Sequence, residues 1–237
     1  MIQDKKNGFT IIELLLAMSF VAMLMVAIAV MVMQMSNIMV KGKTFKELNT
    51  ASRLINSDLT RNFNSLQNID GWDGRSFVSG ATPGASYVNN ELGGAFCTGD
   101  FTYVWNRATA LNNGNGPAQY RGSTDNTIRF IRIKDVTKRY CQDSSADVWT
   151  EIPRDSSQVT EILPPGETDL MLYDIRFRQV GVDAATGQSM INIQYVLGTR
   201  GDSGIDVVNS QCRPNSDLAN YCAINRFDLL VRTIGSK

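Results

Sequence analysis

Histidine is absent from the 237 residues of this sequence. A Ser-His-Asp or Cys-His nucleophilic centre therefore cannot form within the chain, and neither can a zinc site built on imidazole. Positive and negative side chains balance, with 23 Lys and Arg against 23 Asp and Glu. A neutral chain does not favour nucleic acid, so the arginine pairs 129/132 and 176/178 are interpreted as a solvated sheet face. An enzyme is the least supported function class, and we expect no cofactor, no metal and no nucleic-acid partner.

The sequence also lacks any Cys-x-x-Cys pair among its four cysteines, which argues against a zinc ribbon or a thioredoxin-type redox motif. All four cysteines follow the apolar N-terminal segment. An even number on one side of a membrane suggests disulfides formed in an oxidising compartment. Of the three possible pairings we favour Cys212–Cys222, which closes a short loop, with Cys97–Cys141 as its complement. Buried free thiols are the alternative.

Proline is missing from a long apolar run that extends from Leu14 to Met33 and is interrupted only by Ser19. About 20 helical residues span about 30 Å, the thickness of a bilayer core. The run is too long for a conventional signal peptide, and no Ala-x-Ala site follows it. Lysines on both sides leave the positive-inside rule ambiguous, so it is the cysteines that place the C-terminal part outside the cytoplasm.

Glu13 lies at the start of this charge-free run. A charged side chain near the membrane core costs about 2.5–3.5 kcal/mol on insertion scales, which marks Glu13 as a functional candidate. The alternative is that Glu13 extends to the membrane interface. Cleavage after Gly8 would give Phe9 a new α-amino group, cationic near neutral pH and one helical turn from Glu13. Glu13 is then expected to pair with this amine, or with that of a neighbouring subunit.

The cationic leader, Gly8, Phe9-Thr10, Glu13 and the apolar run, in this order, resemble the class III signal of type IV prepilins and type II secretion pseudopilins. The resemblance covers roughly residues 1–60. It implies that a prepilin peptidase cleaves between Gly8 and Phe9 and methylates Phe9, and that Glu13 acts in assembly. Many major pilins have a proline near the position of Val30, so its absence here favours a minor subunit.

The resemblance also implies partners and a location. The expected partners are the prepilin peptidase, other pilin subunits, an inner-membrane assembly platform with its ATPase, and the membrane before assembly. The precursor is expected in the cytoplasmic membrane, and the mature subunit in an extracellular filament or at the cell surface. A pilus and a secretion or competence pseudopilus both fit. The alternative function is an unprocessed bitopic membrane protein with an extracytoplasmic ligand-binding domain.

Apolar residues recur at three- and four-residue steps from Phe45 to Leu66, namely Phe45, Leu48, Ala51 or Ser52, Ile55, Leu59, Phe63 and Leu66. This amphipathic pattern predicts one continuous helix from about Thr10 to about Leu66, because the lone Gly42 costs only about 1 kcal/mol. The expected organisation is a leader at residues 1–8, a transmembrane or filament-core helix at 9–35, its amphipathic half at 36–68, and an extracytoplasmic globular domain at 69–237.

Five segments have the composition of strands, namely 101–105, 127–133, 170–180, 190–197 and 227–234. Residues 183–187 are predicted to form a hairpin turn between two of them. The expected fold class is α+β, with the long helix packed on an antiparallel sheet and loop-rich insertions between the strands. The resemblance to pilins implies the same arrangement.

Overall fold

The computed structural model describes residues 10–66, 87–98, 100–123, 128–136, 139–142, 149–155, 157–166, 169–201, 204–214 and 221–234. Within these ranges the side chains of Val88, Cys141 and Gln142 are not described. Contacts divide the chain into two units, Met1–Gly42 and Lys43–Lys237. Each unit is described by itself.

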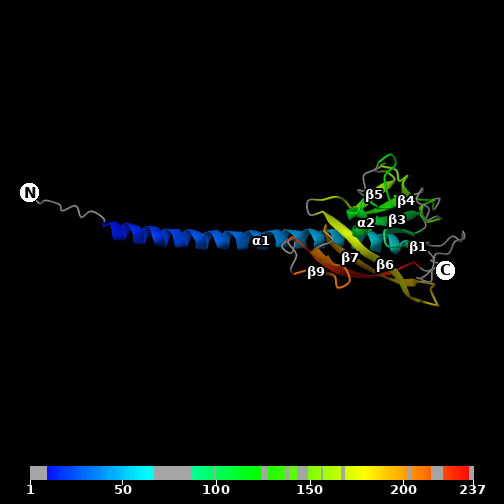
Figure 1. Cartoon of the computed structure of the whole chain (residues 1–237). Coiled ribbons are helices and arrows are strands. Elements are labelled where there is room, and N and C mark those ends of the chain that lie inside the picture. Colours follow the sequence, from blue (N-terminus) through cyan, green and yellow to red (C-terminus); the bar gives the residue numbers. More distant parts are fainter. Residues whose placement is uncertain are drawn as a thin grey trace, which may run out of the picture. The chain divides into compact units, whose positions relative to one another are not determined.

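Helix α1 runs from Ile11 to Phe63 and is 53 residues long (Figure 1). Gly42 does not interrupt it, which confirms the predicted continuous helix. The sequence explains this length, because leucine, methionine and alanine favour the helix and no proline interrupts it. The helix ends three residues before the predicted Leu66, where the Ser65 hydroxyl donates to the Asn62 carbonyl at 2.7 Å. Such side-chain donors satisfy carbonyls that have no partner within the helix.

The first unit consists, in its described part, of the apolar beginning of α1. Its large apolar side chains from Ile11 to Met39 are 50 to 79% exposed within the chain. Mean hydropathy over an 18-residue window reaches 2.8 in α1, which among the described residues is the one helix long and apolar enough to cross a membrane by length and composition. Apolar surface left in water costs about 25 cal/mol per Å², so a helix apolar on all sides requires a lipid or protein environment.

The second unit contains the remainder of α1, which buries one face. The buried residues are Thr44, Leu48, Ala51, Ser52, Ile55, Leu59, Asn62 and Phe63. This stripe matches the predicted one except at its beginning, where Phe45 is 46% exposed and Thr44 is buried instead. Successive helical residues differ by about 100° in direction, so Phe45 lies beside the stripe defined by Thr44 and Leu48.

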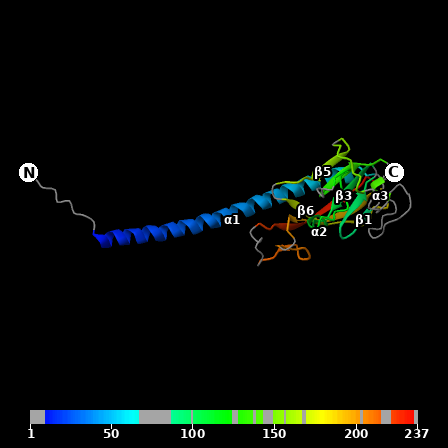
Figure 2. The same ribbon diagram turned by 45° about the horizontal axis from the view of Figure 1, so that its top comes forward.

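Two antiparallel sheets lie against this part of α1, the cyan segment in Figures 1 and 2. The five-stranded sheet has the order β1-β2-β3-β4-β5. Its strands are β1 (Tyr87–Asn89), β2 (Gly93–Cys97), β3 (Phe101–Asn106), β4 (Phe130–Lys134) and β5 (Val159–Leu163). Short helices α2 (Ala108–Asn112) and α3 (Arg139–Gln142) lie in the connections that follow β3 and β4.

The three-stranded sheet has the order β10-β7-β6. Its strands are β6 (Leu170–Val182), β7 (Ser189–Thr199) and β10 (Ile224–Arg232), and a separate two-residue pair joins β8 (Ile205–Asp206) to β9 (Gln211–Cys212). The β6–β7 turn lies at the predicted position, where the Gly187 amide donates to the Asp183 carbonyl at 2.7 Å. The helix and the antiparallel sheets confirm the predicted α+β class.

The main core lies between α1 and the inner faces of both sheets. Stacked phenylalanine rings join these layers at its centre. The Phe63 ring lies 5.2 Å from that of Phe96, which lies 4.4 Å from that of Phe177. A second core covers the outer face of the five-stranded sheet, where Val104 and Ile131 pack with Trp149 and Ile152. The described residues Trp149 and Ile152, which lie between β4 and β5 in the chain, therefore pack on this sheet.

Candidate functional site

The first described residues form a reciprocal cap on α1. The Thr10 amide and hydroxyl donate to Glu13 Oε2 at 3.0 and 2.9 Å, and the Glu13 amide donates to Thr10 Oγ1 at 3.3 Å. This capping box satisfies amides at the helix start that otherwise lack partners. The carboxylate also lies at the positive end of the helix dipole. Glu13 is therefore held in place within its own chain before any partner binds.

The sequence carries a signal for this cap that was not among the predictions, a Thr-x-x-Glu spacing directly before an apolar run. Glu13 is the only charged residue between Thr10 and Val40. The polar Ser19 hydroxyl inside the run donates to the Leu16 carbonyl at 2.8 Å, so the helix itself satisfies it. Gly8 and Phe9 lie outside the described residues. Cleavage, methylation and the Glu13–amine pair therefore stay predictions.

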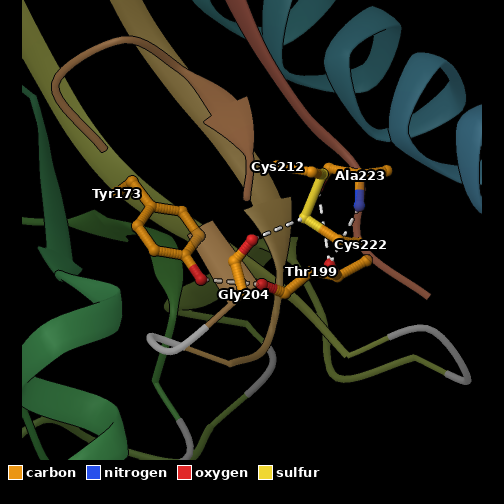
Figure 3. Close-up of a disulfide and its surroundings, with 6 residues drawn as sticks. All are labelled: Tyr173, Thr199, Gly204, Cys212, Cys222 and Ala223. Carbon is orange, nitrogen blue, oxygen red and sulfur yellow. Dashed lines mark hydrogen bonds between the residues drawn. A yellow bond between two sulfur atoms is a disulfide. The ribbon is translucent and has the colours of Figure 1, made fainter. Parts of the chain in front are cut away.

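A disulfide joins Cys212 of β9 to Cys222, which precedes β10, with Cα atoms 5.8 Å apart (Figure 3). This confirms the predicted short-range pairing. Cys97 is also disulfide-bonded. Because the side chain of Cys141 is outside the described residues, the Cys97–Cys141 pairing stays a prediction.

Hydrogen bonds fix the surroundings of this disulfide to the three-stranded sheet. The Thr199 amide donates to the Ala223 carbonyl at 2.8 Å, and the Tyr173 hydroxyl donates to the Thr199 carbonyl at 2.7 Å (Figure 3). Close packing leaves no room for a side chain at Gly198, because a Cβ atom there would lie 2.9 Å from Tyr173 Cε2. The disulfide therefore holds the β8–β9 pair against β7 and β10.

Exposed apolar side chains lie on this disulfide-bonded region. Val208, in the turn between β8 and β9, is 83% exposed, and Tyr221 beside Cys222 is exposed as well. Asp206 accepts hydrogen bonds from the Asn209 amide at 3.2 Å and from Asn209 Nδ2 at 2.8 Å. These bonds lower the pKa of Asp206 and fix the turn.

The arginines interpreted as a solvated face are in large part engaged in ion pairs. Arg129 is buried and pairs with Asp169, and this burial lowers its pKa. Arg132 pairs with Asp58 of α1. The expectation of a solvated face is wrong for Arg129 and Arg132, because their side chains neutralise acids at the junctions between elements.

Arg176 and Arg178 project from the outer face of β6, and both are exposed. Arg176 Nε pairs with Asp174 at 2.7 Å. For this strand, the expectation of a solvated sheet face is confirmed. The described ranges contain no group of three or more His, Cys, Asp or Glu residues that could hold a metal ion.

Comparison with known proteins gives no match to a family model, to a curated protein or to a solved structure. The functional interpretation therefore depends on the residues and the geometry of this chain.

Proposed function

We propose that the chain is a structural, non-enzymatic subunit of a type IV pilus or a related pseudopilus, and a minor subunit rather than the major one. In this proposal a prepilin peptidase cleaves after Gly8 and methylates Phe9, and α1 assembles into the filament core. The observation that carries the proposal is the exposed apolar beginning of α1, which starts with the Thr10–Glu13 cap. Within the first unit, no other described element covers this part of the helix.

Residues 11–39 need an apolar environment around the helix. A helix of about 29 residues is about 43 Å long, enough to cross a bilayer. The membrane covers its side chains in the precursor. In a filament, the helices of neighbouring subunits replace the lipid through close packing. Removal from lipid before this packing is complete is unfavourable, which is why an assembly platform and its ATPase are proposed as partners.

The cap supports a role for Glu13 beyond membrane insertion. Both bonds from Thr10 reach Oε2, so Oε1 remains to accept a hydrogen bond from the amine of Phe9 on a neighbouring subunit. Such a pair reduces the cost of two charges in an apolar surrounding and selects one axial offset between helices. An exposed outer domain with a disulfide-bonded loop then lies on the filament surface.

The mass of the mature N-terminus tests this proposal. The full chain is produced with an active prepilin peptidase and, as a control, with a catalytically inactive one. We expect the active enzyme to yield a chain that begins at N-methylated Phe9, and the control to retain Met1. A chain that keeps Met1 with both enzymes would support the alternative, a bitopic membrane protein with an extracytoplasmic ligand-binding domain.

A further inference from the structure

A groove lies in the second unit between α1 and the segment that connects β5 to β6. Its helix side is a face of residues spaced three and four apart from Lys43 to Leu54. Its other side is formed by Ile162, Leu163, Pro164, Gly166 and Leu170. Ala51, Leu163 and Leu170 are buried in its floor. Leu54 lines the groove and is 56% exposed, so an apolar side chain borders open space there.

The groove has a volume of about 320 Å³. A cavity of about 150 Å³ holds a benzene molecule, so this groove accepts about two or three apolar side chains of a partner. An open apolar groove of this kind is typical of an interaction surface. Its size fits one turn of an amphipathic or apolar helix, which places its side chains at three- and four-residue steps.

Charged side chains stand at the helix side of the groove. Lys43 and Lys46 line it together with Glu47, so this side carries a net positive charge. A helical segment with several apolar side chains and one acidic group therefore complements the groove in both shape and charge.

The first turns of α1 have this composition. Ile11, Ile12 and Leu14 to Leu16 are exposed, and Glu13 is the single charge among them. The cap with Thr10 holds the Glu13 carboxylate in one place, which reduces the ordering cost of a contact. The groove and the first turns of α1 are thus both exposed in a single chain. The groove of one copy is complementary, in shape and charge, to the first turns of α1 of a second copy.

We propose that the groove binds the first turns of α1 of a second copy, with Glu13 beside Lys46 and Ile12 against Leu54. This inference rests on the proposed function and names one contact surface of the assembled subunit. A carboxylate offers about four acceptor positions, so the contact with Lys46 is compatible with the pair between Glu13 and the Phe9 amine.

Crosslinking between two differently marked copies tests the contact. Full-length Ile12→Cys and Leu54→Cys chains are co-produced with the peptidase and treated with a short bis-maleimide. This reagent needs free thiols, and none of the described native cysteines is free. We expect mixed dimers for Ile12→Cys with Leu54→Cys, and several times fewer for Ile12→Cys with Phe45→Cys. Phe45 is the matched control, because it is similarly exposed but lies outside the groove.

The charge contact has its own control. Lys46→Glu in the Leu54→Cys copy should lower the yield of mixed dimers about fivefold, since an exposed ion pair contributes up to about 1 kcal/mol. Lys41→Glu makes the same charge change outside the groove and should leave the yield unchanged. Thermal unfolding of each variant checks that the outer domain is folded.

The outcomes separate the two proposals. Oligomers that begin at Phe9 but show equal crosslinking at positions 45 and 54 would overturn the groove contact and leave the proposed function standing. A retained Met1 without oligomers would overturn both. A photoreactive group at position 54 that captures phospholipid or a different protein, and not a second copy, would also overturn the groove contact.

Discussion

The two parts of α1 share one backbone conformation but differ in what surrounds them. From Ile11 to Met39 the large apolar side chains are exposed, whereas from Thr44 to Phe63 one face is buried under two sheets. Helix formation is thus set locally by propensity and by the cap, and it does not reveal the environment of the helix. The difference lies in the pattern of apolar residues, which are continuous in the first part and periodic in the second.

The largest expected effect tests the buried part. Phe63→Ala removes a ring stacked on Phe96 and Phe177, and should lower the free energy of unfolding by about 3–5 kcal/mol. Leu24→Ala, at an exposed position of the apolar part, should change it by less than about 0.5 kcal/mol. Denaturant unfolding of the full chain in detergent measures both. Equal effects would contradict the division of α1 into two environments.

A polar contact of the buried part has the next largest effect. Asp58 pairs with Arg132 and accepts a hydrogen bond from the Tyr103 hydroxyl at 2.9 Å. Asp58→Ala leaves the Arg132 guanidinium and the Tyr103 hydroxyl without this partner, so the free energy of unfolding should fall by about 2–3 kcal/mol. Glu47→Ala, at an earlier position in the same helix, serves as a comparison. If the loss for Asp58→Ala is no larger than for Glu47→Ala, the pair does not fasten α1 to β4.

A third prediction concerns alkaline pH. The Tyr195 hydroxyl donates to Asn56 Oδ1 at 2.8 Å, and burial raises the pKa of Tyr195 to about 12. Between pH 10 and about 12 the folded state therefore keeps the Tyr195 proton that the unfolded chain loses. The contribution of the buried, neutral Tyr195 to the free energy of unfolding is complete below pH 10 and is lost as pH rises to about 12.

Unfolding of wild type and Tyr195→Phe across this range measures the contribution. The stability difference between them should shrink by about 1–2 kcal/mol as pH rises, because the variant has no phenol to ionise. A constant difference from pH 9 to 12 would show that Tyr195 ionises equally in the folded and unfolded states.

The smallest effect concerns the cap of the exposed part. Thr10→Ala removes the cap and keeps the Glu13 charge, and should cost the helix start about 1 kcal/mol. Glu13→Gln keeps the capping geometry and removes the charge. Hydrogen exchange of the first-turn amides in detergent should therefore accelerate in Thr10→Ala and stay nearly unchanged in Glu13→Gln. If filament incorporation falls only in Thr10→Ala, Glu13 acts through the cap and not through its charge.

Local patterns allowed much of this fold to be predicted. The length of α1, its buried stripe and the alternating strands β6 and β7 follow from period and propensity alone. Strand β2, Gly93-Gly-Ala-Phe-Cys97, could not be found in this way, because three of its five residues are glycine or alanine, which are depleted in strands. Strand β2 forms through its pairing with β3, which approaches it closely at Gly93. A Cβ atom at Gly93 would lie 2.3 Å from the Trp105 carbonyl oxygen of β3, so only glycine fits.

The contacts of the candidate site likewise include some that the sequence predicts and others that it does not. The Cys212–Cys222 pair was predictable because it is close in sequence. The ion pair between Arg132 and Asp58 could not be predicted from the sequence. The two residues are 74 positions apart and meet only when the helix packs on β4. The groove beside Leu54 likewise requires two elements that sequence patterns describe separately.

Strand β10 is the last described strand in chain order, and it completes the cover of α1. The Ile234 amide donates to the Leu66 carbonyl at 2.9 Å, and β10 closes the sheet on which Tyr195 meets α1. The helix precedes every strand that covers it, so the cover of the stripe from Leu48 to Phe63 is complete only after β10 has been synthesised. Contacts between such distant residues form slowly. A chain shortened before Ile224 would lack Phe227, Leu229 and Val231, which pack in the core with α1, and would leave that part of the core exposed.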